Sequence, residues 1–302
     1  MKEILIIGYG SIGKRHVNNL IDLGYQPIVL TKYPDQNESI IFVDNFDRCV
    51  DVEYCIIATP TANHYKDFKN VINHTYCKNF LIEKPIDCNL QNAINILNVA
   101  IKKQMKVHVA YDMRFINVFE KIKTFIEDEL DNIRLVKIVA GQYLPEWRPL
   151  RDYRLSYSAH KYMGGGVDLD LSHEIDYMLW LFGHPNKKLI SYKKKISDLE
   201  IDSPDYFKGL YEYPRFIIDV EIDYFRKLER SLRLIGENCE LVFLDFIKRK
   251  ILLHGKEAKE DNLFNNNTYV EELKEFLNLK PHKKLCTIEE SIKVLEVIQE
   301  HV

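Results

Sequence analysis

The sequence has few cysteines and no long apolar run, and both absences narrow the class of protein. The six cysteines among its 302 residues are far apart and form no CxxC pair. We therefore expect reduced thiols that pack in the core, with no disulfide framework and no metal site. No apolar run approaches the roughly 20 residues that span a bilayer, and the strand pattern starts almost at Met1, so we expect no leader peptide. We expect a cytoplasmic protein without a membrane partner.

An excess of charge of one sign is also missing. The 42 Lys and Arg residues nearly balance the 45 Asp and Glu residues, and the formal net charge is -3. With this balance we expect no basic surface that would bind a polyanion, so nucleic acid is not an expected partner. Hydrophobic residues at 46% and charged residues at 29% are typical of a globular protein, and the length allows two domains.

Glycine is sparse as well, but three of the 12 glycines lie in one short loop. An apolar run over 4–7 leads directly into Gly8-Tyr9-Gly10-Ser11-Ile12-Gly13. In a dinucleotide-binding loop the first glycine permits a tight turn, the second lets the backbone approach a pyrophosphate, and the third lets helix pack on strand. An apolar stripe follows and ends at Gly24, which predicts a helix over 11–23. The alternative is a glycine turn in another kind of α/β protein.

Strand and helix patterns alternate through the first third of the chain. They predict strands near 3–7, 27–30, 54–58, 80–83 and 106–110, with helices near 11–23, 63–73 and 90–103. Such alternation predicts an α/β Rossmann domain with a doubly wound parallel sheet. We place this domain at residues 1–115.

The pattern changes after Tyr111. A helix is predicted over 118–126, followed by strands over 133–144, 188–196, 205–213, 215–225, 231–236 and 240–246. Tight turns at 213–215 and 236–238 connect several of them, so we expect an α+β domain with a mostly antiparallel open sheet over 116–302. Helices are expected over 168–182 and 287–301. The second has a capping box of Thr287 and Glu290, and it is the helix that would pack back on the first domain.

Three polar segments follow successive predicted strands, where an open parallel sheet binds its ligand. They cover 59–64, 83–85 and 111–115. Thr61 or Asn63 is also expected to cap the helix that follows. Lys84 stands between a strand end and a proline, so we expect its ammonium to enter the crevice, hydrogen-bond a substrate hydroxyl and take part in acid/base chemistry. The alternative is a purely structural pair with Glu83.

Four segments in this order, GYGSIG, ATPTANH, EKP and GGGVDLDLSHEID, resemble the Gfo/Idh/MocA oxidoreductases. The resemblance implies a Rossmann domain followed by an open antiparallel sheet, a nicotinamide cofactor, and a sugar-like substrate oxidised or reduced at a secondary carbon. It also implies that Lys84 is catalytic and binds substrate, that the Lys84-Pro85 bond is cis, and that the protein forms homodimers or homotetramers. We expect such pairing through the uncovered face of the C-terminal sheet.

The triglycine segment opens a predicted helix that carries Asp168, Asp170 and His173. Asp170 and His173 are three residues apart and would share one helix face. We predict His173 as the general acid/base, with Asp170 beside it in a catalytic and substrate-binding role. Many family members carry the acid four residues before the histidine, where this chain has Leu169. The alternatives are favourable helix-terminal charge for the two aspartates and a buried, hydrogen-bonded histidine.

A long polar and aromatic loop covers 144–161. Aromatic rings can stack on a sugar, and arginines can grip a carboxylate or diphosphate, so we expect an anionic sugar substrate. The alternative is a surface loop that only connects two elements, and the basic run 193–195 is expected to be a solvated strand face. The predicted substrate-binding residues are Lys84, Tyr111, Trp147, Arg151, Tyr153, Arg154, Asp170 and His173.

The end of the second predicted strand bears on the choice of cofactor. NAD sites usually carry an acid there, whereas this chain has Thr31-Lys32-Tyr33. The Lys32 ammonium suits the 2′-phosphate of NADP, so we expect NADP as the cofactor. NAD stays possible, because Asp35 is an acid only a few residues further along the chain. The predicted cofactor-binding residues are Gly8, Gly10, Ser11, Ile12, Gly13, Thr31, Lys32, Ala58, Thr59, Pro60, His64, Glu83, Lys84 and Arg114.

These observations predict an oxidoreductase that moves a hydride between NAD(P) and a sugar carbon. The substrate is expected to be an anionic or nucleotide-linked sugar of surface-polysaccharide metabolism. Two alternatives stay open. One is a catalytically silent NAD(P)-binding sensor or assembly subunit, and the other is an imine or enone reductase on the same fold.

Overall fold

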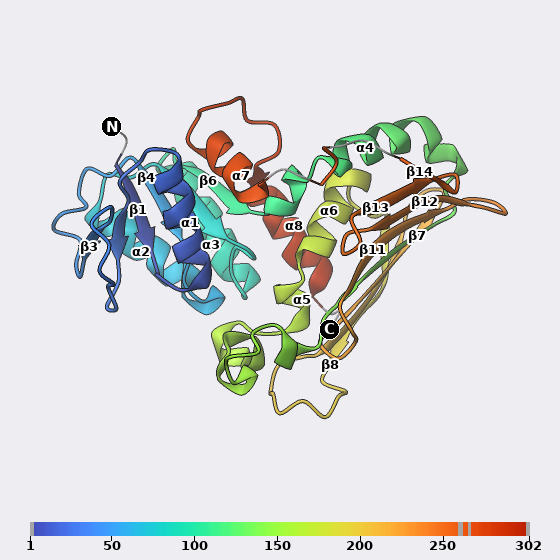
Figure 1. The fold of residues 1–302 in the computed structure, drawn as a ribbon, viewed down its shortest axis with the longest axis horizontal. Coiled ribbons are helices and arrows are strands. Elements are labelled where there is room, and N and C mark those ends of the chain that lie inside the picture. The colour runs from blue at the N-terminus through green and yellow to red at the C-terminus, as the bar shows by residue number, and fades with distance from the viewer. Residues whose placement is uncertain (1–2, 259–261, 265–266, 300–302) are drawn as a thin grey trace. The chain divides into compact units, whose positions relative to one another are not determined.

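The computed structural model describes residues 3–258, 262–264 and 267–299. It divides into two compact units: unit 1 is Met1–Phe115 with Asn267–Ile292, and unit 2 is Ile116–Asn266 with Lys293–Val302. The segment 267–292 lies within the range 116–302 predicted for the second domain, but it is part of unit 1. Each unit holds one sheet with its own helices (Figure 1).

Sheet A of unit 1 has seven strands among the described residues, in the order β15-β6-β5-β4-β1-β2-β3. Strands β1 to β6 pair in parallel in the order 3-2-1-4-5-6, which is the order of dinucleotide-binding folds. The predicted doubly wound sheet is therefore confirmed. The strands are β1 (Ile4–Ile7), β2 (Ile28–Leu30), β3 (Ile41–Val43), β4 (Tyr54–Ile57), β5 (Asn79–Glu83), β6 (Lys106–Ala110) and the antiparallel β15 (Cys286–Thr287).

The helices of unit 1 lie close to their predicted positions, except for one that was not predicted. They are α1 (Ser11–Asp22), α2 (His64–His74), α3 (Leu90–Lys102), the unpredicted α7 (Thr268–Phe276), and α8 (Ile288–Ile298), which continues into unit 2. The predicted end of the last helix at His301 lies outside the described residues.

The two predicted helix caps have different outcomes. The capping box of α8 is confirmed, because Glu290 N donates to Thr287 Oγ1 (3.2 Å) and Thr287 N donates to Glu290 Oε2 (2.8 Å). The cap expected from Thr61 or Asn63 is wrong. Asn63 occupies the N-cap of α2 without a side-chain bond, and 61–63 form a 3-10 turn.

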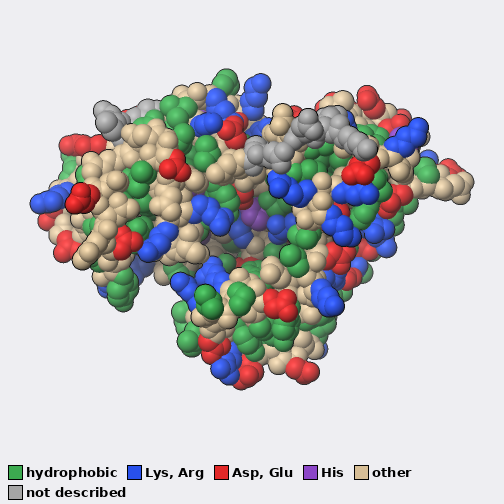
Figure 2. Space-filling view, viewed as in Figure 1, with side chains coloured by type: hydrophobic (Ala, Val, Ile, Leu, Met, Phe, Trp, Pro, Cys, Tyr) green, Lys and Arg blue, Asp and Glu red, His purple; other side chains and the backbone are tan. Residues whose placement is uncertain are grey.

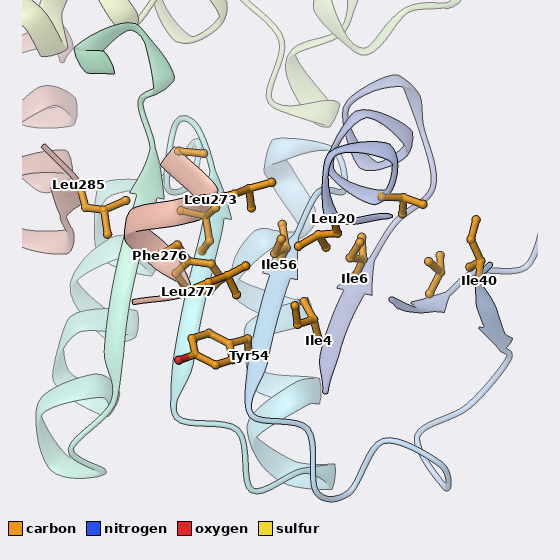
Figure 3. Close-up of a cluster of buried hydrophobic side chains, with 14 of the residues drawn as sticks. Ile4, Ile6, Leu20, Ile40, Tyr54, Ile56, Leu273, Phe276, Leu277 and Leu285 are labelled. Carbon is orange, nitrogen blue, oxygen red and sulfur yellow. The ribbon is translucent and has the colours of Figure 1, made fainter. Parts of the chain in front are cut away.

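Helix α7 completes the hydrophobic core of unit 1. Figure 3 shows Leu273, Phe276 and Leu277 on the side of the sheet where Tyr54 and Ile56 of β4 project. The rings of Tyr54 and Phe276 meet edge to face at 5.3 Å, and Asn278 Nδ2 donates to the Tyr54 hydroxyl at 2.9 Å. Because a buried Leu or Phe side chain stabilises by about 1.5–3 kcal/mol, α7 contributes substantially to this unit.

Sheet B of unit 2 has eight strands among the described residues, in the order β14-β13-β12-β11-β7-β10-β9-β8. Every neighbouring pair is antiparallel except β7 with β10, so the mostly antiparallel prediction is confirmed. The predicted turns at 213–215 and 236–238 join antiparallel neighbours. The strands are β7 (Leu135–Gly141), β8 (Lys187–Lys194), β9 (Tyr206–Glu212), β10 (Ile217–Asp223), β11 (Glu229–Ile235), β12 (Glu240–Asp245), β13 (Lys250–Leu253) and β14 (Lys256–Glu257).

In unit 2 one helix extends beyond its predicted end at 126, and the helix predicted over 168–182 is replaced by two shorter ones. The helices are α4 (Val118–Glu129), α5 (Val167–Asp170), α6 (His173–Phe182), and the 3-10 turns Leu130–Asn132, Leu144–Glu146, Tyr153–Leu155, Tyr157–Ala159 and Lys161–Met163. The described helices include none with the length and apolar character to cross a membrane.

Sheet B has one buried face and one charged face. Val136, Ile138 and Val220 alternate with less buried neighbours along β7 and β10. On the second face Lys208 Nζ pairs with Asp219 Oδ1 (2.5 Å) and Glu221 Oε2 (3.2 Å). Acidic and basic side chains both occur on each unit in Figure 2, in keeping with the small net charge.

The six cysteines are free thiols. Four are buried, and burial raises the pKa of Cys77 to about 12, which makes its thiol unreactive. Cys239 departs from the predicted packing role, because it is exposed in the turn between β11 and β12.

Candidate dinucleotide-binding and catalytic site

The glycine loop connects β1 to α1 and is shaped by backbone contacts. Gly8 has φ +97°, and a Cβ there would lie 2.7 Å from Ala58 O. A Cβ on Gly13 would lie 2.2 Å from Gly8 O, so only glycine lets α1 approach the loop. Gly10 differs, because a Cβ there would meet no described atom within 4 Å. The protein itself leaves space at Gly10, which fits the close approach of a pyrophosphate.

The N-terminus of α1 begins at Ser11, directly after Gly10. Gly10 occupies the N-cap and supplies no side-chain hydrogen bond to the first turn. The leading N–H groups of a helix attract phosphate, both as donors and through the helix dipole. The residues present therefore fit a dinucleotide, with Ser11 and Ile12 in the first turn.

An acidic residue lies beside this loop, just past the end of β2. Asp35 accepts hydrogen bonds from the Tyr9 hydroxyl (2.8 Å) and from Lys14 Nζ (3.1 Å). These bonds hold the pKa of Asp35 below its usual value, while burial and then the Asp35 carboxylate raise the pKa of Tyr9 to about 12. Lys32 is exposed three residues earlier, and Thr31 is half-buried. The Asp35 charge is thus already compensated by Lys14.

His64 joins the segments that follow β4 and β5. Its Nε2 lies 2.9 Å from Thr59 O, and its Nδ1 lies 3.1 Å from Pro85 O and 3.2 Å from Ile86 O. The ring is 1% exposed. Sequence analysis placed His64 among the cofactor-binding residues, but the bonds found for its ring go to backbone carbonyls, so it holds the 59–64 segment against Lys84-Pro85. That peptide bond is cis, as the family resemblance implied.

Glu83 ends β5 and immediately precedes Lys84. Its carboxylate lies 2.6 Å from His16 Nε2, and both side chains are buried. His16 lies on α1 and was not singled out from the sequence. The hydrogen bond found for the Glu83 carboxylate therefore joins the end of β5 to α1.

Tyr111 and Arg114 follow β6 and are both buried. Arg114 Nη1 donates to Glu290 Oε2 at 3.0 Å. Burial alone would raise the pKa of Glu290, but the Arg114 charge and the Thr287 hydrogen bonds outweigh it and lower that pKa. Arg114, predicted to bind cofactor, thus ties the end of β6 to the start of α8.

The predicted helix over 168–182 is two helices, which corrects the geometry expected for the catalytic pair. Leu171 has φ -99° and ψ 32°, outside the helical range, so α5 ends at Asp170 and α6 begins at His173. Asp170 and His173 therefore do not share a face of one continuous helix. His173 is 8% exposed.

Both candidate aspartates have partners within unit 2. Asp170 Oδ2 accepts from the Tyr224 hydroxyl at 2.5 Å, and Asp170 also hydrogen-bonds Tyr157. Burial first, and the Asp170 charge second, raise the pKa of both tyrosines well above the usual value. Asp168 Oδ2 pairs with Lys193 Nζ at 2.7 Å, so the expectation of a solvated face at 193–195 is wrong for Lys193.

Asp170→Ala is expected to destabilise unit 2 by about 1–3 kcal/mol, because the buried tyrosine hydroxyls lose their acceptor. Urea unfolding measures the change in free energy, and Asp198→Ala on the exposed surface is the matched control. A loss below about 0.5 kcal/mol, the size of an ordinary surface effect, would contradict the assignment of this carboxylate as acceptor.

The 144–161 loop folds into consecutive 3-10 turns with internal bonds. Trp147 Nε1 donates to Gln142 O (3.0 Å), and its ring meets Tyr224 edge to face at 5.3 Å. Arg154 pairs with Asp152 and Glu200, and the Tyr153 hydroxyl accepts from Glu200 N. Arg151 is exposed. Several predicted substrate contacts thus also hold the loop together.

Strand order, glycine loop and the space at Gly10 together define unit 1 as a dinucleotide-binding domain. Residues 2–111 match the GFO_IDH_MocA model, described as an oxidoreductase family with an NAD-binding Rossmann fold. The match covers the dinucleotide-binding domain, so residues 2–111 are similar to the NAD-binding domain of that oxidoreductase family. The predicted catalytic set draws on both units, with Lys84 in unit 1 and Asp170 and His173 in unit 2.

Two curated relatives come from Bacillus subtilis. The uncharacterized oxidoreductase YrbE is 26% identical over 195 residues, covering 59% of this chain and 53% of YrbE. Glucose-6-phosphate 3-dehydrogenase is 26% identical over 192 residues, covering 60% of this chain and 54% of the relative. The chain therefore matches about half the length of each.

Solved structures resemble the whole fold. The WlbA dehydrogenase from Bordetella pertussis, in complex with NADH and UDP-GlcNAcA, superposes with a TM-score of 0.78 at 15% identity. The match covers 98% of this chain and 94% of WlbA. It shows that the two-domain fold is shared.

Proposed function

We propose that this protein is an NAD(P)-dependent dehydrogenase that moves a hydride between its cofactor and a secondary carbon of an anionic or nucleotide-linked sugar. One observation carries the proposal. The loop with open space at Gly10 and the segment with Lys84 follow strands of the same parallel sheet, at its carboxyl edge, and His64 links the second segment to Thr59. The proposal is that the cofactor and the lysine share this edge, where such sheets bind ligands.

Each residue then has a stated task. The backbone at Gly8, Gly10 and the first turn of α1 holds the pyrophosphate. The nicotinamide supplies the hydride chemistry. Lys84 binds and polarises the reacting hydroxyl or carbonyl through its ammonium, and His173 moves the proton.

The carboxylate of Asp170 takes a supporting part in this proposal. Its bonds to Tyr157 and Tyr224 fix the end of α5, three residues before the start of α6 at His173. We therefore assign Asp170 to placing His173. Arg151, exposed in the aromatic loop, is the proposed anchor for an anionic group.

Relatives support the substrate class. WlbA is described with UDP-GlcNAcA, and another structural neighbour is a UDP-N-acetylglucosamine 3-dehydrogenase. A curated relative is a glucose-6-phosphate 3-dehydrogenase. All three act on or bind phosphorylated sugars, which is the basis for proposing an anionic sugar, and surface-polysaccharide metabolism uses such nucleotide sugars.

The test is turnover with UDP-GlcNAcA, UDP-N-acetylglucosamine and glucose 6-phosphate, each with NAD and NADP, followed by nicotinamide absorbance. Glucose is the uncharged control. We expect kcat/KM for one anionic sugar to exceed that for glucose by about 100-fold, the scale of an Arg-anion contact. Tight cofactor binding without turnover of any sugar would favour a silent sensor instead.

Lys32→Asp is expected to weaken NADP binding by about 10- to 100-fold and NAD binding by less than about threefold, because a carboxylate repels the 2′-phosphate that Lys32 would meet. Fluorescence titration with both reduced cofactors measures the two affinities. Lys102→Asp, on the exposed part of α3, controls for charge change alone. Equal losses for both cofactors would remove the argument for NADP.

A further inference from the structure

Three polar side chains around the glycine loop form one cluster, which consists of Tyr9, Lys14 and Asp35. Asp35 Oδ2 accepts hydrogen bonds from both the Tyr9 hydroxyl (2.8 Å) and Lys14 Nζ (3.1 Å). The same ammonium lies 4.6 Å from the centre of the Tyr9 ring, which is within the range of a cation–π contact. Each member therefore contacts the other two, and the position of the Lys14 ammonium is fixed by two partners.

This cluster lies at the end of β2, where dinucleotide-binding folds distinguish their cofactors. Gly8 N donates to Leu30 O at 3.3 Å, so the loop starts against the last residue of β2. The Tyr9 ring packs edge to face on Phe42 of β3 at 5.3 Å. With a pyrophosphate at Gly10, the adenosine ribose of the cofactor would extend toward the end of β2. The cluster would then border the 2′ position of that ribose.

The Asp35 carboxylate is already used by the protein. In an NAD site an acid in this region binds a ribose hydroxyl. Here the Tyr9 hydrogen bond first, and the bond and charge of Lys14 after it, hold the pKa of Asp35 below its usual value. The side chains of Lys14 and Asp35 are 51% and 42% exposed. Because an ammonium has three N–H donors and Asp35 takes one, Lys14 can also bind an anion that arrives from solvent.

A 2′-phosphate is compensated better by two cations than by one. Its charge at neutral pH is about −2, so a single lysine compensates only half of it. Lys32 is the cation predicted for this contact, two residues past the end of β2 and exposed. Lys14 supplies a second positive charge from α1, next to the segment after β2 through its bond to Asp35.

We propose that Lys14 is a specificity-determining residue: its ammonium, placed by Asp35 and the Tyr9 ring, binds the 2′-phosphate of NADP together with Lys32. Asp35 is then the counter-ion of Lys14 and not the acceptor for the ribose of NAD. The inference rests on the proposed function only for the binding of an NAD(P) cofactor, and it requires no turnover of a sugar. It adds a residue on α1 that was not predicted from the sequence.

Lys14→Met removes the ammonium and keeps the length of the side chain. We expect the Kd of NADPH to rise by about 10-fold, because a charge-assisted contact with the phosphate is lost, and the Kd of NADH to change by less than about threefold. Fluorescence titration with each reduced cofactor at low ionic strength measures both constants. Lys69→Met is the matched control, because Lys69 on α2 is also exposed and lies 5.4 Å from a tyrosine ring, that of Tyr65.

Asp35→Asn tests the part assigned to the carboxylate. The amide oxygen can still accept from Tyr9 and Lys14, but the negative charge is gone. We expect the Kd of NADPH to fall by about 3- to 10-fold, because Asp35 no longer repels the 2′-phosphate, and the Kd of NADH to change by less than about threefold. A rise in the Kd of NADH beyond that limit is expected instead if Asp35 binds a ribose hydroxyl, and it would overturn the inference.

The outcomes separate the inference from the function on which it rests. If both cofactors bind the wild type and Lys14→Met leaves the Kd of NADPH unchanged, Lys14 does not bind the 2′-phosphate, and the dehydrogenase proposal stands. If Lys14→Met shows the selective loss but no sugar is turned over, the inference stands and the dehydrogenase proposal fails. Binding of neither cofactor would overturn both. Equal losses for NADPH and NADH in Lys14→Met would show that Lys14 supports the loop and selects no cofactor.

Discussion

Lys84→Ala should lower kcat by about 10²- to 10⁴-fold, the usual contribution of a positioned acid/base group. The affinity for the reduced cofactor should change by less than about threefold, because the pyrophosphate is held by the glycine loop and the first turn of α1. Steady-state kinetics and fluorescence titration measure the two quantities separately. A loss confined to kcat is the mark of an interaction made in the transition state.

The matched control for this variant is Lys66→Ala, an exposed lysine on α2. It should leave both kcat and cofactor affinity unchanged. Thermal unfolding of Lys84→Ala should stay within about 2 °C of the wild type if the variant loses chemistry and not structure. Turnover at the wild-type rate in Lys84→Ala would remove this residue from the mechanism.

Gly10→Ala should lower cofactor affinity and Gly13→Ala should lower stability, although both glycines lie in one loop. A methyl at Gly10 meets no described protein atom, so stability is expected to change by less than about 1 kcal/mol, while the pyrophosphate loses its close approach and cofactor affinity falls about 100-fold. A methyl at Gly13 would lie 2.2 Å from Gly8 O, so it forces α1 away from β1. We expect Gly13→Ala to destabilise the protein by several kcal/mol.

Urea unfolding and cofactor titration of both variants test this contrast. The two variants control for each other, because each adds one methyl group to a glycine of the same loop that has no positive φ. If Gly10→Ala binds cofactor as the wild type does, the space at Gly10 is not where the pyrophosphate lies. If Gly13→Ala is as stable as the wild type, α1 does not depend on that contact.

Sequence patterns correctly predicted the elements that are determined by residues close together in the chain. The apolar run of β1, its glycine loop and the capping box at Thr287 were all identified from neighbours in the chain, and each is confirmed. Strand β3 was not predicted. It has only three residues, and Ile41 on it is exposed, so it lacks the buried apolar run that made the other strands recognisable.

Contacts between distant residues were the main source of error at the site. Lys193 was expected in solvent, but Asp168 lies 25 positions away in sequence and 2.7 Å away in space. The partners of the His64 ring were not predicted either: its nitrogens lie within hydrogen-bond distance of the backbone carbonyls of Thr59, Pro85 and Ile86. Nothing in the spacing of residues shows which buried polar groups will compensate one another.

The amino-acid sequence alone determined the parallel sheet, the loop for a dinucleotide and the lysine that follows β5, because periodicity, glycine spacing and strand ends are properties of short segments. Only the tertiary structure decided that α7 returns to fill the core of unit 1, that α5 and α6 are separate, and that Glu83 is held by His16 and Asp170 by two tyrosines. The reason is physical. The burial of a side chain and its hydrogen-bond partners depend on which segments pack together in three dimensions. The pattern of residues along the chain does not show which distant segments make these contacts.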